Sequence, residues 1–168
     1  VHITDSSNQM IAATARTIVH PAKFYTGISS IKNISGFPKK GDTLKFNYLF
    51  IKPDGTVPLY SDFGKDKKMK VELLRENWKE IQQIGYNGEI NTRYEREMIS
   101  DETSTEHLKN DGEEHELSIK PKHGGAYLLR LTAKDNRGAD VVTERRFYVT
   151  SSDWNWFNRD DAQEITMQ

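Results

Sequence analysis

The feature that most constrains the fold is an alternating stretch in the C-terminal third of the chain. From Tyr127 to Ala133 every second residue is apolar, a period that places these side chains on one face of a β-strand. The sequence Asp-Asn-Arg-Gly at residues 135–138 favours a chain reversal, because Asx residues supply local hydrogen bonds and glycine tolerates positive φ. A second strand is predicted from about Val141 to Val149. The two strands predict a long hairpin, typical of antiparallel sandwiches.

Alternation recurs elsewhere in the chain. It is clearest in the segment with Leu44, Phe46, Tyr48 and Phe50, and it returns at Met69, Val71 and Leu73. Lys52–Gly55 predicts a turn, and Glu116–Pro121 predicts another strand. A short isolated helix is conceivable at Lys79–Ile84, and the charged run Asp101–Gly112 suggests a mobile loop. We therefore predict an all-β fold, an antiparallel β-sandwich of about seven strands.

The beginning of the chain resembles the end of this hairpin. With Asp5 placed on Asp135, the gapless alignment also puts Arg16 on Arg146 and Val19 on Val149. His20-Pro21 then suits a boundary, because proline lacks a donor for strand pairing. We predict that residues 1–19 are the C-terminal hairpin of a preceding domain, residues 20–150 a complete domain, and residues 151–168 a connector into the next.

Composition argues against several classes of function. The formal net charge of −1 gives no electrostatic reason to bind nucleic acid or an anionic membrane surface, so neither partner is expected. The absence of cysteine excludes disulfides, thiol catalysis and cysteine–zinc sites. The histidines show no ligand spacing: His2, His20, His107, His115 and His123. The acidic run after residue 100 lacks the pattern of a calcium loop. We expect no catalytic residue, metal or cofactor.

Three aromatic residues near the C-terminus are the most distinctive candidates for a contact surface. Trp154, Trp156 and Phe157 lie within four residues, outside the predicted sandwich. They could pack across a junction with the next domain, which we favour, or form a platform for a sugar or another chain. Trp78, in contrast, is expected in the core.

Several motifs resemble one known family. His20–Ile28, with the sequence HPAKFYTGI, resembles the opening of a macroglobulin domain in bacterial alpha-2-macroglobulins. Further motifs occur in the order that those proteins show: Lys52–Gly55, Val71–Trp78, Lys120-Pro121 with Gly124–Tyr127, and Arg146–Val149. The tail from Trp154 to Ile165 resembles the connector into the domain that carries the bait region. The resemblance covers essentially the whole chain.

The resemblance implies a structural role in a protease trap. In this family a target protease cleaves a bait loop, a Cys–Gln thioester is exposed, and the collapsing protein entangles the protease. This chain has no cysteine and so holds no thioester. The resemblance therefore implies a non-catalytic scaffold domain of an endopeptidase inhibitor of the periplasm or cell envelope. Its partners would be neighbouring macroglobulin domains and, through the full-length protein, target proteases.

A second hypothesis belongs to a different class. An immunoglobulin-like or fibronectin-like adhesion or carbohydrate-binding module could use Trp154, Trp156 and Phe157 as its ligand surface.

Overall fold

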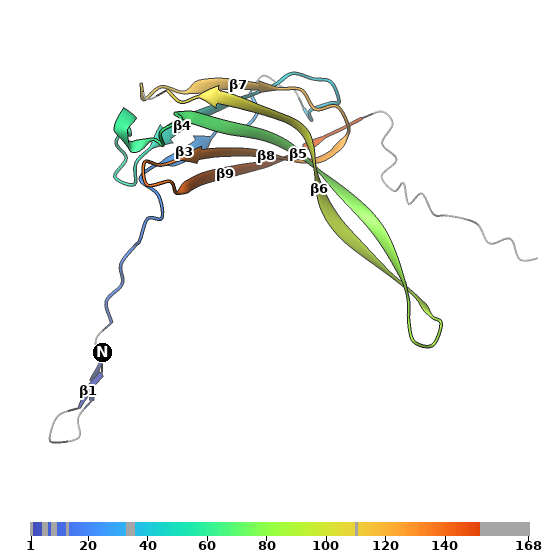
Figure 1. The fold of residues 1–168 in the computed structure, drawn as a ribbon, viewed down its shortest axis with the longest axis horizontal. Coiled ribbons are helices and arrows are strands. Elements are labelled where there is room, and N and C mark those ends of the chain that lie inside the picture. The colour runs from blue at the N-terminus through green and yellow to red at the C-terminus, as the bar shows by residue number, and fades with distance from the viewer. Residues whose placement is uncertain are drawn as a thin grey trace, which may run out of the picture.

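The structure, a computed structural model, describes residues 2–4, 7, 10–12, 14–32, 36–109 and 111–151. Two antiparallel sheets lie face to face (Figure 1). One sheet has the order β3 (Tyr25–Ile28), β4 (Leu44–Ile51) and β7 (His115–Ile119). The other has the order β6 (Ile90–His107), β5 (Lys68–Ile84), β8 (Gly125–Lys134) and β9 (Asp140–Val149). The seven strands confirm the predicted all-β antiparallel sandwich.

The core forms where the alternating faces of the two sheets meet. Every second residue of β4 is buried from Leu44 to Phe50, and so is every second residue of β8 from Tyr127 to Ala133. Since a strand pleat turns alternate side chains to opposite faces, each strand contributes one apolar row to the interior. Each large apolar side chain buried in this way contributes about 1.5–3 kcal/mol to stability.

Two predicted turns are confirmed in detail. At the end of β4, Gly55 has a φ of 83° and its N–H donates to the carbonyl of Lys52 at 2.9 Å. Between β8 and β9, Gly138 has a φ of 86° and its N–H donates to the carbonyl of Asp135 at 3.0 Å. Both positions use the left-handed backbone that glycine adopts without steric cost.

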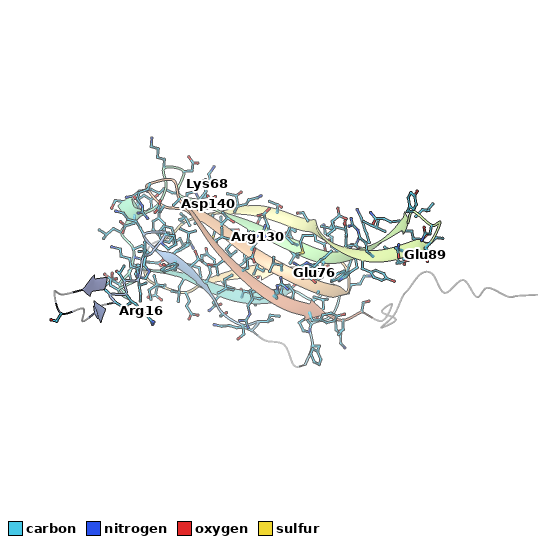
Figure 2. All side chains as sticks on the ribbon, turned by 90° about the horizontal axis from the view of Figure 1, so that it is seen from below. Arg16, Lys68, Glu76, Glu89, Arg130 and Asp140 are labelled. Carbon is cyan, nitrogen blue, oxygen red and sulfur yellow. The ribbon has the colours of Figure 1, made fainter. Side chains whose placement is uncertain are left out.

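A long two-stranded ribbon extends beyond the sandwich. β8 pairs with β5 only from Met69 to Arg75, whereas β5 and β6 stay paired as far as Ile84 and Ile90. Residues 76–98, called the arm below, project from the four-stranded sheet (Figures 1 and 2). The arm closes in a turn in which Gly85 N–H donates to the carbonyl of Glu89 at 2.7 Å.

β5 and β6 correct three sequence-based expectations. Lys79–Ile84 is strand and not helix, because each of these residues has a cross-strand partner on β6. The charged run from Asp101 is strand as far as His107, because an edge strand can pair its backbone on one side while its charged side chains reach water. Trp78 is 61% exposed and not in the core, since it lies on β5 beyond the last residue that β8 covers.

The N-terminal residues form the expected hairpin. β1 (His2–Thr4) and β2 (Met10–Ala12) pair antiparallel in a two-stranded sheet of their own, with His2 opposite Ala12. Exposed residues 14–20 lead from this hairpin to the sandwich (Figure 1). The assignment of residues 1–19 to a preceding domain stays a prediction.

One short 3-10 helix, η1 (Tyr60–Asp62), crosses between the sheets, and the described residues contain no α-helix. Nothing helical in the described ranges has the length and apolar character needed to cross a membrane.

Candidate junction site

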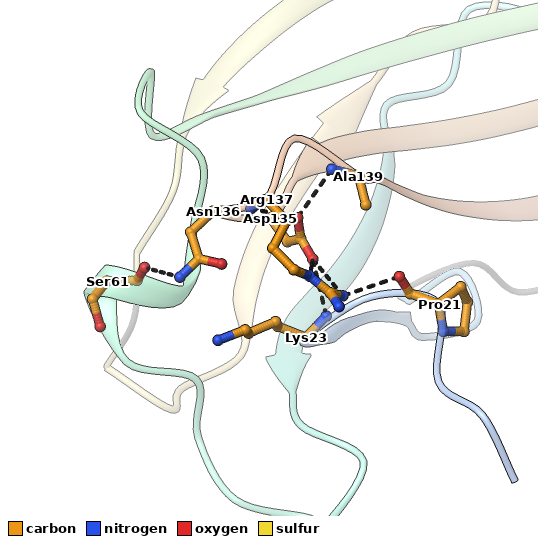
Figure 3. Close-up of polar contacts among 7 residues, drawn as sticks. All are labelled: Pro21, Lys23, Ser61, Asp135, Asn136, Arg137 and Ala139. Carbon is orange, nitrogen blue, oxygen red and sulfur yellow. Dashed lines mark hydrogen bonds and ion pairs between the residues drawn. The ribbon is translucent and has the colours of Figure 1, made fainter.

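The turn between β8 and β9 surrounds a completely buried carboxylate. Asp135 has no exposed side-chain surface and accepts five N–H donors. Its Oδ1 accepts from the backbone amides of Arg137 and Ala139 at 2.9 and 3.0 Å. Its Oδ2 accepts from the Arg137 guanidinium at 3.0 and 2.9 Å and from the backbone amide of Lys23 at 3.3 Å (Figure 3). The aspartate therefore connects its own turn to a segment more than a hundred residues earlier.

That earlier segment leads the chain into β3. Arg137 also donates to the carbonyl of Pro21 at 3.1 Å, so two hydrogen bonds hold residues 21–23. Directly after these residues, Phe24 is fully buried, and its ring centroid lies 4.6 Å from that of Phe63. The hydrogen bonds and the aromatic anchor together fix where the chain enters the sandwich.

A third segment joins the cluster through Asn136. Its side-chain amide donates to the carbonyl of Ser61 at 2.8 Å, and its backbone amide donates to the carbonyl of Asp62 at 2.8 Å (Figure 3). Next to η1, Gly64 N–H donates to the carbonyl of Lys134 at 2.7 Å. A Cβ on Gly64 would lie 3.0 Å from the Lys134 Cβ, so glycine permits this close approach.

The charges in the cluster are mutually compensating. Burial alone would raise the pKa of Asp135, but hydrogen bonds from the Arg137 side chain and from the backbone amides of Ala139, Arg137 and Lys23 hold that pKa below its usual value. The pKa of Asp62 is also lowered, first by the backbone amide of Leu59 and then, against the effect of burial, by Lys52. Both carboxylates are therefore ionised at neutral pH.

This arrangement suits a structural role. Five donors occupy the two oxygens of Asp135, which leaves little capacity for proton transfer or for coordination of a metal. A buried, fully hydrogen-bonded carboxylate of this kind fixes one geometry, because any displaced donor would be left without a partner. We call the residues Pro21–Lys23, Ser61, Asp62 and Asp135–Ala139 the junction cluster.

A second polar contact lies at the opposite end of the sandwich. Asp101 has no direct partner in the β5–β6 register, which shifts between Leu73 and Leu74. Its carboxylate accepts a 2.6 Å hydrogen bond from the hydroxyl of Tyr127. Burial, and then this hydrogen bond, raise the pKa of Tyr127. The Tyr127 ring stacks on Phe147 of β9, so this contact holds the root of the arm against β8 and β9.

The residues singled out in the sequence fall partly outside and partly inside the described ranges. Trp154, Trp156 and Phe157 lie outside the described residues, so their predicted contact stays a prediction. His20 hydrogen-bonds to the Tyr25 hydroxyl at 2.8 Å, and His115 to Asp111 at 2.8 Å. Across the described ranges, no group of three His, Cys, Asp or Glu residues is arranged to hold a metal ion. Asp135 was foreseen as a turn residue, but its distant donors left no local signal in the sequence.

No family model matches the sequence, and no curated protein matches it. Solved structures with a similar fold include two bacterial alpha-2-macroglobulins. Salmonella alpha-2-macroglobulin reacted with methylamine matches 88% of this chain with a TM-score of 0.55 and 16% identity. The native conformation of E. coli alpha-2-macroglobulin matches 89% of it with a TM-score of 0.55 and 18% identity.

The chain has the fold of a segment of these bacterial alpha-2-macroglobulins. At such low identity the likeness concerns the fold, and it agrees with the resemblance seen in the sequence motifs. The chain spans 10% of the length of the Salmonella protein and 9% of the length of the E. coli protein.

Proposed function

We propose that this chain is a non-catalytic structural domain of an alpha-2-macroglobulin-like protein that traps proteases. The bait segment and the thioester would lie elsewhere in the longer polypeptide. This domain would keep its neighbours in position before cleavage and transmit the rearrangement afterwards. The trap would act in the periplasm or cell envelope, as the family resemblance implies.

The observation that carries the proposal is the fold match. Most of this chain superimposes on about a tenth of each alpha-2-macroglobulin, as expected for one domain among many. The order of the motifs from His20 to Val149 supports the same assignment independently of the structure.

The junction cluster supplies a physical means for the proposed role. A domain that transmits movement needs a rigid connection to the segment that enters it. Here Asp135 and Arg137 hold residues 21–23 against the sandwich through two hydrogen bonds, and the two side chains are themselves fixed by an ion pair in which Asp135 is fully buried. Charge-assisted bonds in such surroundings are stronger than neutral ones and favour a single geometry.

The test uses the full-length protein. It is treated with a protease in limiting amount, then analysed on a native gel for compaction and on a denaturing gel for covalently captured protease. We expect cleavage to produce both a faster-migrating form and a covalent adduct. Cleavage without compaction or capture would contradict the proposal. The adhesion or carbohydrate-binding hypothesis would then be tested by replacing Trp154, Trp156 and Phe157.

A further inference from the structure

The arm has two chemically different faces. In an antiparallel pair, directly opposite residues share a face, so the register of β5 and β6 assigns each side chain. One face, called the charged face of the arm, carries Lys79, Glu95 and Glu97. On this face Lys79 and Glu97 form an ion pair at 2.5 Å. The other face, called the apolar face of the arm, carries five of the arm's large apolar side chains, interspersed with five polar ones. The apolar residues are Trp78, Ile84, Ile90, Tyr94 and Met98, and the polar residues are Glu76, Glu80, Gln82, Thr92 and Arg96.

The apolar face is largely open to water in this structure. Trp78 is 61% exposed, Ile84 80%, Ile90 65% and Tyr94 50%. Side chains of this size contribute to stability only when buried, and a two-stranded ribbon alone is marginally stable. Exposed apolar side chains gathered on one face of such a ribbon make that face a candidate interaction surface.

The root of the arm lies where the chain leaves the sandwich. Glu76, at the root, makes ion pairs with Arg96 of β6 and Arg146 of β9, each at 3.4 Å. β9 ends three residues after Arg146, at Val149, beside the first residue of β8. The C-terminal end of β9 and the root of the arm therefore lie at the same end of the sandwich, opposite the junction cluster (Figures 1 and 2, the latter with Glu76 at the root and Glu89 near the tip).

The size of the face favours a tethered partner over a second copy. Nine residues per strand at about 3.3 Å each, on a ribbon about 10 Å wide, give a face of roughly 300 Å². Stable complexes between separate proteins bury about 800 Å² on each partner. A covalently linked neighbour needs less, because the linkage gives it an effective concentration in the millimolar range.

We propose that the apolar face of the arm docks on the domain that follows β9 in the full-length polypeptide. That domain would present an apolar patch to Trp78 and Tyr94, while the charged face of the arm stays in water. The arm would then stabilise the connection that follows β9, as the junction cluster stabilises the connection that leads into β3. This inference rests on the proposed function, because it requires a multidomain polypeptide.

Single cysteines test the docking, since this chain has none of its own. Tyr94→Cys probes the apolar face, and its neighbour Glu95→Cys is the matched control on the charged face. Maleimide labelling rates are measured in residues 1–168 and in the full-length protein before protease treatment. The label taken up by full-length protein without an added cysteine is subtracted. Ile84→Cys and Gln83→Cys form a second pair on β5, in case one variant perturbs the ribbon.

We expect the cysteine of Tyr94→Cys to react at least about tenfold more slowly in the full-length protein than in residues 1–168, because a docked state with about 90% occupancy leaves only about a tenth of the molecules reactive. The labelling rate of Glu95→Cys should be the same in the two proteins. Equal rates for Tyr94→Cys in the two proteins would overturn the proposal, and so would equal protection of both faces. If the labelling rate of Tyr94→Cys in residues 1–168 falls as the concentration of that protein rises, the partner is a second copy, and the proposal is also overturned.

The outcome is separable from that of the proposed function. Compaction after cleavage is measured on the same preparations. Compaction with an unprotected Tyr94→Cys refutes the docking and leaves the trap standing. Protection without compaction supports the docking and refutes the trap.

Discussion

Replacing Asp135 with alanine should be among the most destabilising polar substitutions in the sandwich. The change removes the only side-chain acceptor in the junction cluster for three backbone amides and the Arg137 guanidinium. The amides cost about 1 kcal/mol each when left without a partner. Arg137 is 53% exposed and can turn to water, so its share adds little. The expected loss is about 3 kcal/mol, or roughly 10 °C in Tm.

The assay is urea unfolding of residues 1–168 at pH 7, followed by circular dichroism. Glu144→Ala is the control, because Glu144 lies on the same hairpin and makes only a partly exposed ion pair with Arg130 at 2.7 Å. That variant should lose less than about 1 kcal/mol. If Asp135→Ala costs no more than Glu144→Ala, the argument that the buried carboxylate organises the junction is wrong.

The same position predicts a pH dependence. Because the folded state lowers the pKa of Asp135, ionisation of this group stabilises the protein above its unfolded pKa of about 4, and the contribution is lost as pH falls through the lower, folded pKa. The stability difference between wild type and Asp135→Asn should therefore be largest near neutral pH and shrink in acid. A difference that is constant from pH 7 to pH 3 would contradict the assignment.

Two further substitutions test the packing. Gly64→Ala should cost about 1–3 kcal/mol by driving a Cβ against Lys134, whereas Gly27→Ala, whose Cβ would meet Leu49 at an ordinary 3.7 Å, should be tolerated; thermal unfolding compares the two. Leu129→Ala should cost about 2–5 kcal/mol because this side chain is fully buried, whereas Trp78→Ala in residues 1–168 should cost less than about 1 kcal/mol; urea unfolding that ranks them in the opposite order would refute the assignment of core and arm.

The sequence predicts those strands of the sandwich that have one buried face and one exposed face. On β4 and β8 the contrast between core and solvent imposes a two-residue alternation, so Leu44 to Phe50 and Tyr127 to Ala133 could be identified directly. The fold class followed from these strands and from the glycine-containing turns between them.

The arm could not be predicted in the same way. Both faces of the arm meet water in this chain, so no apolar period marks residues 79–84 as strand. Residues 101–107 lie on the edge strand β6 within the sandwich, and their charged side chains suggest a loop. The position of Trp78 at the end of a predicted alternating strand favours the core. Its exposure follows from the end of β8 pairing at Arg75, which is a property of the sheet and not of the local sequence.

The junction cluster was hidden for a related reason. Asp135 signals a turn locally, but Lys23 and Pro21 are more than a hundred residues away. Only the folded topology brings these donors and acceptors together.

The most direct test of the account follows compaction in the full-length protein carrying Asp135→Ala, with Glu144→Ala as the control, below the temperature at which either variant unfolds. Protease is added, and native-gel mobility is recorded over time alongside the extent of cleavage. The account predicts normal cleavage in both variants, wild-type compaction for Glu144→Ala, and slower or incomplete compaction for Asp135→Ala. Identical compaction and capture in both would contradict the claim that this domain transmits the rearrangement through its junction.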